Sequence, residues 1–351
     1  MKNILLTGGT GYIGSHTALK LLIKGYKVTI LDSNINSSAN VIKRMGEILQ
    51  KINPQIINNL TFIKGDLRDY KLVKNIFQKS LEKANSIDSV IHFSGLKSVA
   101  ESKINPLNYW DVNICSTINL LRIMDEYECK RLIFSSTATV YGEKNKPPFK
   151  ETCNLNPVSP YANTKASIEI MLHDIFTSKK ESWNIINLRY FNPISAHKSG
   201  LLGESPTGNP NNLFPIILNA VIKNQKINVF GNNWPTPDGT CIRDYIHIED
   251  LAEGHIKALE NQFLIGNQYD CYNLGTGKGT SVFELISVFE DVNKVKIPYQ
   301  ITSRREGDTA ILVADNSYAF DKLNWSPKRS LQDMCKDGYN WIINNPNGYD
   351  N

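Results

Sequence analysis

Tyr161 and Lys165 stand four residues apart, directly after Pro160. If the segment after Pro160 is helical, the two side chains lie on one face, about one turn apart. A free tyrosine has a pKa of about 10 and is a poor base at neutral pH, but a nearby cation favours the phenolate and lowers that pKa. The pair therefore indicates a general acid/base that moves a proton off a sugar or alcohol hydroxyl. The same spacing also occurs on ordinary surface helices, so its meaning depends on the elements around it.

The first 32 residues predict one strand–helix–strand unit. Residues 3–7 are a short apolar run, and residues 12–24 carry apolar side chains at helical spacing. Gly25 stands where a glycine that ends a helix belongs, and residues 27–31 form a second strand that ends at Asp32. An acidic residue about 20 positions past a glycine turn is typical of a dinucleotide-binding βαβ unit.

The glycine turn contains Gly8, Gly11 and Gly14, a GxxGxxG pattern that departs from the usual GxGxxG. The missing Cβ atoms permit a tight turn, a close approach of backbone amides to a pyrophosphate, and close helix–strand packing. The pyrophosphate would lie at the positive N-terminus of the helix. Asp32 would accept hydrogen bonds from an adenosine ribose, and because a carboxylate repels a 2′-phosphate, NAD is favoured over NADP. A plain glycine-rich turn is the alternative.

Further short apolar runs end in small or polar residues, at 61–63, 88–93, 130–134 and 184–188. Helical stretches separate them, which is typical of an α/β fold with a doubly wound parallel sheet of the Rossmann type. We expect an NAD-binding domain over residues 1–190 and a smaller C-terminal α/β substrate domain over 191–351, with some segments crossing back. Ligands gather at the carboxyl ends of such strands, where the following residues fall: Asp66, Gly95, Lys97, Thr137 and Tyr190.

Two of these strand-end residues have a possible role and an ordinary alternative. Asp66 could hydrogen-bond an adenine ring, or it could be an exposed loop carboxylate. Thr137 could hydrogen-bond a substrate hydroxyl and share its proton with Tyr161, or it could simply cap its strand.

Composition narrows the class of protein. The 351 residues are 21% charged and 41% hydrophobic with a net charge of +5, and no block of Lys or Arg suggests nucleic acid or a membrane surface. No export signal or long apolar run is apparent. The six cysteines form no CxxC pair and the histidines are scattered, so we expect reduced thiols, a cytoplasmic location and no metal site.

A series of motifs, in order along nearly the whole chain, resembles the extended short-chain dehydrogenases/reductases, and within them the UDP-glucose 4-epimerases. The motifs that carry the resemblance are Gly8–Ser15, His92–Lys97, Phe134–Gly142, Tyr161–Lys165, Arg189–Pro193, Pro210–Leu213, Asp238–His247 and Arg305–Asp308.

The resemblance implies reversible epimerisation at C4 of UDP-glucose and UDP-galactose, through a transient 4-keto sugar and with tightly bound NAD. Tyr161 would take the proton of the 4-hydroxyl, and Thr137, where the family often has serine, would assist. Lys165 would hold the nicotinamide ribose and lower the pKa of Tyr161. The implied cofactor site comprises Gly8, Gly11, Tyr12, Ile13, Gly14, Asp32, Asn36, Asp66, Leu67, Phe93, Lys97, Asn113, Lys165 and Tyr190.

The second half begins with a segment rich in Gly, Pro and Asn over residues 192–212, which we expect to be a functional loop. A helix is predicted over 214–223, a strand over 227–230 and a loop over 231–240. By resemblance, the UDP-sugar site comprises Lys97, Thr137, Tyr161, Asn192, Asn212, Leu213, Phe230, Arg243, Arg305, Asp308 and Leu312.

Three polar residues of this implied site suit a nucleoside diphosphate. Arg243 and Arg305 suit the diphosphate, and Asp308 suits a ribose diol. For each arginine a surface ion pair is the alternative. Residues 275–277 resemble a second phosphate loop, but we interpret them as a structural strand–helix turn, with Ser281 as a helix cap.

Leu312 bears on the range of substrates. In the family, a bulky tyrosine at this place restricts the pocket beside the sugar 2-substituent, and a small residue admits N-acetyl sugars. Leucine is intermediate in size. We expect activity mainly on UDP-glucose and UDP-galactose; the alternative is an epimerase that acts mainly on UDP-N-acetyl-hexosamines or another UDP-sugar.

Residues of the same region argue against three other functions. Related 4,6-dehydratases carry an Asp-Glu pair directly after the threonine of the catalytic strand, but Ala138 and Thr139 stand here. The glutamate of the UDP-uronate decarboxylases is absent too. A non-catalytic NAD sensor would be expected to lose Tyr161 or Lys165. The family usually forms a homodimer through two helices per subunit, and residues near 100–125 and 162–178 are the candidates.

Overall fold

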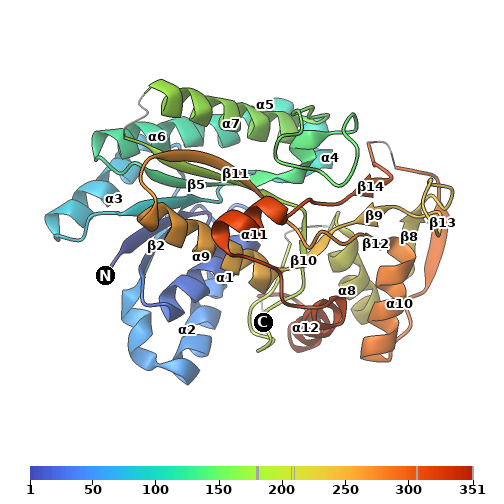
Figure 1. Ribbon diagram of the computed structural model, residues 1–351. Helices are drawn as coiled ribbons and strands as arrows, with labels where there is room; N and C mark the ends of the chain where they lie inside the picture. The colour runs from blue at the N-terminus through green and yellow to red at the C-terminus, as the bar shows by residue number, and fades with distance from the viewer. Residues whose placement is uncertain (179–181, 207, 209, 306, 350–351) are drawn as a thin grey trace.

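A seven-stranded parallel sheet is the centre of the computed structural model, which describes residues 1–178, 182–206, 208, 210–305 and 307–349 (Figure 1). The strand order is β11-β6-β5-β4-β1-β2-β3. Every neighbouring pair is parallel. The order reverses direction at β1, the kind of place where doubly wound sheets bind ligands. The strands are β1 (Asn3–Thr7), β2 (Lys27–Asp32), β3 (Leu60–Lys64), β4 (Ser89–His92), β5 (Arg131–Thr137), β6 (Asn184–Tyr190) and β11 (Gln268–Leu274).

Helices cover both faces of this sheet (Figure 1). One face carries α1 (Tyr12–Ile23), α2 (Asn40–Ile52) and α9 (Ile248–Leu264); the other carries α3 (Tyr70–Glu82), α6 (Ser116–Glu126) and α7 (Pro160–Ser178). Alternate strand residues point to opposite faces. In β1, Ile4 and Leu6 join the core beneath α1, while Leu5 joins the core beneath α3 and α7. Two apolar cores therefore hold the sheet between the helical layers.

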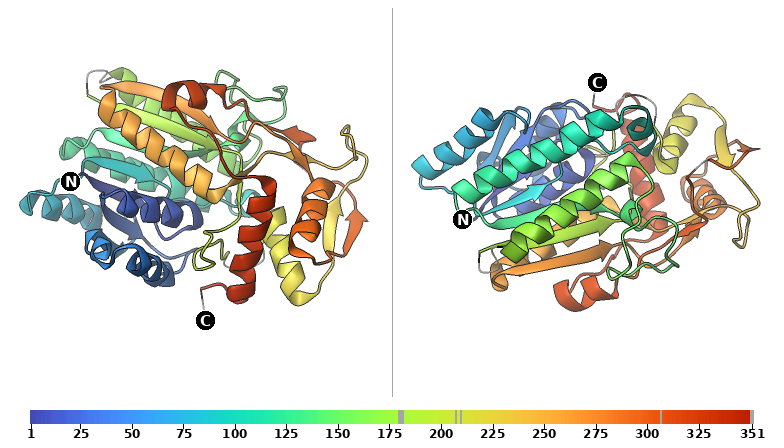
Figure 2. Two further views of the ribbon diagram at one scale, coloured as in Figure 1. Left: turned by 60° about the horizontal axis from the view of Figure 1, so that its bottom comes forward. Right: turned by 90° about the horizontal axis from the view of Figure 1, so that it is seen from above.

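A smaller lobe lies beyond the carboxyl edge of the sheet (Figures 1 and 2). In it β8 (Ile227–Phe230) pairs with β13 (Tyr299–Thr302), and β9 (Ile242–Arg243) pairs with β12 (Thr280–Ser281) and β14 (Ile311–Leu312). Between the lobe and the sheet, β7 (Asn192–Ile194) pairs with β10 (Tyr245–His247). The helices of the lobe are α8 (Leu213–Lys223), α10 (Val282–Asn293) and α12 (Leu331–Asn344), while α11 (Ser317–Leu323) packs against α9 and β11.

The remaining helical elements are short. On the α7 side they are α4 (Val99–Ile104), α5 (Pro106–Trp110), a π-helical turn over Asp111–Cys115 and a 3-10 helix over Ala138–Tyr141. A 3-10 helix over Pro54–Asn59 packs against α1, α2 and β3 instead. The chain then returns from the smaller lobe, because α9 and β11 belong to the layers of the main sheet although both come after residue 191.

Most elements predicted from periodicity are confirmed. The first strand, helix and second strand are β1, α1 and β2, and Gly25 has a φ of 85° after α1. Ser281 caps α10 in a reciprocal capping box with Glu284. Thr276 and Gly277 donate their amides to the Asp244 carboxylate, which supports a structural turn there.

One expectation was wrong in part. The segment over residues 192–212 does not begin as a loop, because Asn192–Ile194 forms β7. A three-residue strand that contains a proline is too short to show periodicity in the sequence. Within the described part of the chain, no helix is both long and apolar enough to cross a membrane.

Candidate active site

A cleft opens at the carboxyl edge of the sheet, where the smaller lobe faces it. It is lined by nearly all of the residues proposed for cofactor and substrate: Gly8, Gly11, Tyr12, Ile13, Gly14, Asp32, Asn36, Asp66, Leu67, Phe93, Lys97, Thr137, Tyr161, Lys165, Tyr190, Asn192, Asn212, Leu213, Phe230, Arg243, Arg305 and Asp308. Leu312 lines an adjoining hollow. The chain thus brings both predicted groups into one place, from strand ends and loops far apart in sequence.

The glycine turn after β1 fits the close approach of a phosphate. Gly8 has a φ of 71°, and a Cβ there would lie 2.7 Å from the Ser94 amide nitrogen. A Cβ on Gly14 would lie 2.5 Å from the Gly8 carbonyl oxygen. Gly11 precedes the first turn of α1 and contributes no side chain. The first residues of α1 line the cleft, and a helix N-terminus in this position is an arrangement suited to an anion.

Asp32 is buried at the end of β2 with its carboxylate held in place. One oxygen accepts the Thr10 amide at 3.0 Å, and the other accepts the Asn34 amide at 2.9 Å and the Ser37 hydroxyl at 3.1 Å. A carboxylate fixed in this way can still accept a ribose hydroxyl, since each oxygen has two lone pairs.

Asp66 is paired with a neighbour that the sequence analysis did not name. The Arg68 guanidinium lies 2.7 Å from the Asp66 carboxylate and 2.5 Å from that of Asp111. This pairing lowers the pKa of Asp66. Arg68 also lines the cleft, so this end of the cleft presents an ion pair rather than a lone carboxylate.

Tyr161 and Lys165 lie in the first turns of α7. Ser159 accepts the Ala162 amide at 3.2 Å, and Pro160 is the first helical residue, a combination typical of a helix start. Lys165 Nζ donates to the Ser135 carbonyl at 2.8 Å and stands 4.8 Å from the centre of the Phe134 ring. The helix thereby presents both side chains to the end of β5.

The electrostatics of the pair differ from the expectation that Lys165 lowers the pKa of Tyr161. Burial raises the pKa of Tyr161 to about 12, and a hydrogen bond with Thr137 opposes that change. Burial lowers the pKa of Lys165 to about 8. In the protein part of the site, burial thus has the largest effect on the pKa of both groups.

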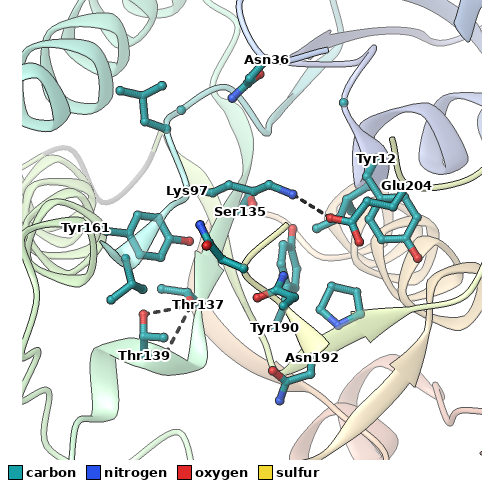
Figure 3. Close-up of a pocket in the computed structure, with 18 of the residues that line it drawn as sticks. Tyr12, Asn36, Lys97, Ser135, Thr137, Thr139, Tyr161, Tyr190, Asn192 and Glu204 are labelled. Atoms are coloured by element: carbon teal, nitrogen blue, oxygen red, sulfur yellow. Dashed lines mark hydrogen bonds and ion pairs between the residues drawn. The ribbon is translucent and has the colours of Figure 1, made fainter. Parts of the chain in front are cut away.

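Thr137 ends β5 and its hydroxyl lies below the Tyr161 hydroxyl (Figure 3). Thr137 Oγ1 accepts the Thr139 amide at 3.2 Å and lies 3.0 Å from the Thr139 hydroxyl. On the other side of the cleft, the Tyr190 hydroxyl is hydrogen-bonded to His255 Nε2. The Tyr161 phenol and the Thr137 hydroxyl thus both face the cleft at the end of β5.

Asn113 does not line the cleft. Its carboxamide accepts the Leu96 amide at 2.8 Å and donates to the Leu96 carbonyl at 3.2 Å and the Thr164 hydroxyl at 2.9 Å. It thereby fixes the loop next to Gly95. Lys97 Nζ in turn lies 3.0 Å from Glu204 across the cleft, as Figure 3 shows.

The two arginines of the substrate half share one carboxylate. Asp308 lies 2.9 Å from the Arg305 guanidinium and 3.5 Å from that of Arg243. Arg243 also donates to the Thr309 carbonyl at 2.8 Å, and Arg305 stands 5.5 Å from the centre of the Phe230 ring. Both cations therefore line the cleft while contacting Asp308. Glu306, in the same motif, lies outside the described residues.

Leu312 is placed beside these cations, because β14 pairs with β9 so that Leu312 is opposite Arg243. It packs against a small cluster that contains Ala138 and Phe191. A leucine in this position is half-buried and narrows the hollow next to the end of β5.

Sequence reasoning missed several residues of the site, among them Arg68, Glu204 and His255. Arg68 follows Asp66 by two positions and could have been suspected as its partner. Glu204 lines the cleft and contacts Lys97 over 107 residues, and His255 lies behind the cleft and contacts Tyr190 over 65 residues. Such long-range contacts leave no local pattern in the sequence.

Searches against known proteins agree with one another. A family model described as GDP-mannose 4,6 dehydratase matches residues 5–338. A UDP-glucose 4-epimerase of Bacillus subtilis is 46% identical over 347 residues, which are 99% of this chain and 98% of that protein.

Two solved structures have the same fold. A UDP-glucose 4-epimerase of Stenotrophomonas maltophila, with bound NAD and a formylated UDP-arabinopyranose, has a TM-score of 0.91 at 40% identity, with 98% of each chain covered. The enzyme of Bifidobacterium longum, in complex with NAD⁺ and UDP, has a TM-score of 0.91 at 41% identity, with 99% of this chain and 100% of that chain covered. The chain belongs to the UDP-glucose 4-epimerase family of the extended short-chain dehydrogenases/reductases.

Proposed function

We propose that the protein interconverts UDP-glucose and UDP-galactose by epimerisation at C4, with NAD retained in the cleft. The observation that carries this function is the convergence of Tyr161, Lys165 and Thr137 at the end of β5, between a phosphate-binding glycine turn and the Arg243–Asp308–Arg305 cluster. Proton-transfer groups thus stand between a dinucleotide site and a nucleoside-diphosphate site, as a reaction on a sugar nucleotide requires.

The residues of the main sheet fit NAD. Gly8 and Gly14 leave the space that a pyrophosphate needs, and the carboxylate of Asp32 suits an unphosphorylated ribose. When bound, NAD supplies the hydride acceptor for C4 and afterwards the hydride donor. The proposed cofactor residues are Gly8, Gly11, Tyr12, Ile13, Gly14, Asp32, Asn36, Asp66, Leu67, Phe93, Lys97, Lys165 and Tyr190, with Asn113 supporting the loop before Lys97.

Tyr161 is the proposed base for the sugar 4-hydroxyl. Its phenolate is disfavoured by burial in the protein alone, and the positive charges of Lys165 and of an oxidised nicotinamide both favour it. Thr137 bridges the phenol and the sugar hydroxyl. The same residues return the proton after the 4-keto sugar has turned over in the pocket.

The smaller lobe holds the nucleotide, and the sugar is held more loosely. Arg243 and Arg305 bind the diphosphate, Asp308 the ribose, and Asn192, Asn212, Leu213 and Phe230 complete the wall. Binding energy far from C4 then retains an intermediate that is free to rotate. Accordingly, residues 1–190 form the NAD-binding domain and residues 191–351 the UDP-sugar-binding domain, with α9 and β11 crossing back.

Elimination is not proposed, although the matching family model is described as a dehydratase. A 4,6-dehydratase needs carboxyl groups beside the catalytic threonine to remove the 6-hydroxyl. Here Ala138 is apolar and buried, and the Thr139 hydroxyl is 3.0 Å from that of Thr137. Neither can act as a strong acid or base at neutral pH.

The protein is proposed to work as a cytoplasmic homodimer. All six cysteines are free, which suits a reducing compartment. On the face of α4, α5 and α7, apolar side chains are exposed: Ile104 by 78%, Leu107 by 83% and Ile170 by 58%. Because α4 and α5 pack against α7, this surface, here called the α5/α7 face, suits burial against a second copy.

The function can be tested through the spectrum of the purified protein. Added UDP-galactose is expected to raise the absorbance of reduced cofactor in the wild type. Tyr161→Phe should slow that change by about 100-fold or more, since it removes the general base. Tyr299→Phe, at an exposed tyrosine of β13, is the control and should behave as wild type. A protein that retains NAD but shows no spectral change would be a sensor rather than an enzyme.

A further inference from the structure

A buried charge cluster lies directly behind the proton-transfer pair. Tyr161, Lys165 and Glu169 follow one another at intervals of four residues on α7, so they share one face of the helix. That face meets the last three residues of β5. Tyr161 and Thr137 line the same cleft, Lys165 donates to the Ser135 carbonyl, and Glu169 accepts from the Ser136 hydroxyl.

Glu169 also joins this helix to the neighbouring strand β6. Its side chain is only 3% exposed, and both oxygens accept from Arg189, at 3.1 Å from Nε and 2.6 Å from an Nη. This two-pronged geometry is the strongest form of a carboxylate–guanidinium pair. The Glu169 carboxylate thus binds two adjacent strands at once.

Arg189 extends the cluster to the turn after β5. Its second Nη donates to the Tyr141 hydroxyl at 3.0 Å and to the Glu151 carbonyl at 3.1 Å. The Tyr141 hydroxyl donates to Asn273 of β11 at 2.6 Å. Both oxygens of the Glu169 carboxylate accept hydrogen bonds from within the protein. Glu169 itself is not among the residues that line the cleft.

We infer that Glu169 is a positioning residue for the reaction: it fixes the register of α7 on β5 through Ser136, and it supplies the negative charge that faces the Lys165 ammonium. This inference rests on the proposed epimerase function. The cluster of Glu169, Arg189 and Ser136 would hold Tyr161 over Thr137, and Lys165 beside the nicotinamide ribose.

The charges around Lys165 support this second task. Burial lowers the pKa of Lys165, and the Glu169 carboxylate opposes that change. On β4, His92 is buried and its pKa is lowered to about 3, so it is neutral at physiological pH. Arg189 on β6 is the permanent cation of the cluster, and Glu169 neutralises it. Loss of the Glu169 charge would leave Lys165 facing Arg189 without a counter-ion.

Charged and titratable groups on β11 and on the loop after β5 also face the cluster. The Tyr269 hydroxyl donates to the Glu169 backbone carbonyl at 3.0 Å, and burial raises the pKa of Tyr269 above its ordinary value. Burial likewise raises the pKa of the Cys271 thiol and of the Glu151 carboxyl. Tyr269 and Cys271 are therefore neutral near pH 7, which leaves Glu169 as the near counter-charge of Lys165.

Two substitutions separate the contact of α7 with β5 from the negative charge that faces Lys165. Glu169→Gln removes the charge, and Ser136→Ala removes the contact to β5 while the Glu169–Arg189 pair stays. Each should lower kcat for UDP-galactose roughly tenfold or more, with KM changed by less than about threefold, because a small misplacement of catalytic groups is costly. Asp174→Asn, at an exposed carboxylate on the same helix, is the matched control and should keep the wild-type kcat.

The pH profile distinguishes positioning from general support of the fold. In Glu169→Gln the alkaline limb of kcat should move to lower pH, because Lys165 loses its proton more readily. In Ser136→Ala the limb should stay in place, and since that variant keeps the buried ion pair, it can be assayed if Glu169→Gln fails to fold. Wild-type kcat in folded Ser136→Ala, or an unmoved limb in folded Glu169→Gln, would overturn the inference. An inactive wild type would instead refute the proposed function.

Discussion

Lys165 is a cation enclosed in the protein, with the Ser135 carbonyl as its hydrogen-bond partner and a phenyl ring beneath it. Such a group is maintained for its chemistry, because taking an ammonium out of water costs free energy. Burial likewise disfavours the charged form of Tyr161, so its phenol stays neutral until positive charge comes near. Both residues thus lower the stability of the protein while they provide its reactivity.

Replacement of Lys165 by methionine should stabilise the protein while abolishing epimerisation. Lowering a lysine pKa from 10.5 to about 8 corresponds to about 3 kcal/mol, and the lost hydrogen bond offsets part of the gain. We expect the free energy of unfolding at pH 7 to rise by roughly 2 kcal/mol, as measured by denaturant titration.

The sign of this effect is checked by pH. Below pH 8, Lys165 is charged in both folded and unfolded protein, so the burial penalty is complete. Between about 8 and 10.5 the unfolded protein binds more protons, and wild-type stability rises with pH. The gain in free energy of unfolding from Lys165→Met should therefore shrink across that range. Lys71→Met, at an exposed lysine, is the control and should leave the free energy of unfolding unchanged at every pH. An advantage that grew with pH would contradict this account.

Leu312 is expected to decide the range of sugars. The wild type should act mainly on UDP-galactose, with slow turnover of UDP-N-acetylgalactosamine, because leucine is larger than the residues that admit an N-acetyl group. Leu312→Ala should raise the ratio of the N-acetyl rate to the UDP-galactose rate by about tenfold, the scale of a few methylene groups in a pocket. Leu312→Tyr is the opposite control. Equal rates of the wild type on both substrates would refute this role.

Site residues could be predicted when the residues they act with lie close to them in sequence. The glycines, Asp32 and the Tyr161–Lys165 pair are marked by short-range spacing, and all of them line the cleft. Asn113 was predicted at the cofactor from the resemblance, and its carboxamide contacts Leu96 and Thr164, which the sequence did not indicate. Partners contributed from distant loops, such as Glu204, cannot be inferred from neighbours in sequence.

At the scale of elements, the turn between β1 and α1 is where backbone geometry limits substitution most. A Cβ on Gly14 would approach the Gly8 carbonyl oxygen to 2.5 Å and Gly9 Cα to 2.8 Å. Both neighbours are backbone atoms, so relief requires the helix to move away from the turn. The same movement would displace the amides that face the cleft.

Gly14→Ala should therefore destabilise the protein by roughly 1–3 kcal/mol and reduce the NAD retained after purification. Gly46→Ala on α2 is the matched control, because the nearest atom to its Cβ would be a side-chain carbon 3.7 Å away. That change should stabilise by about 0.5–1 kcal/mol, as alanine favours a helix interior. Thermal melts and cofactor absorbance measure both. Equal melting of the two variants would show that close packing at the turn is unimportant.

Elements with a clear period were predictable and short ones were not. The inner strands β1, β4, β5 and β6 are buried on both faces and contain apolar runs, and α8 and β8 also lie where periodicity placed them. The resemblance indicated a helix near residues 100–125, but periodicity did not separate α4, α5 and the π-helical turn before α6, because each has six residues or fewer. Their geometry depends on tertiary contacts with α7.

At the scale of the whole molecule, the α5/α7 face is predicted to be a subunit interface. Leu107→Glu places a charge at its most exposed apolar residue and should convert dimers to monomers in light scattering after size exclusion. Leu264→Glu is the control, since Leu264 is 85% exposed at the end of α9, on the other face of the sheet. A mass unchanged by Leu107→Glu alone, or a wild-type monomer, would contradict the interface.

The order of the domains along the chain was easier to foresee than their interleaving. A parallel sheet followed by a different composition after residue 191 indicates two parts. The return of β11 to the edge of the sheet beside β6 depends on its pairing over 84 residues, from Gln268 to Asn184. Such long-range pairing joins the substrate half to the cofactor half and keeps the cleft between them.

The central claim, C4 epimerisation with retained NAD, is tested most directly by proton NMR. The purified protein is incubated with UDP-galactose and no added NAD. We predict conversion to UDP-glucose until signals of both sugar nucleotides coexist at equilibrium. No conversion, even after NAD is supplied to correctly folded protein, would contradict the account.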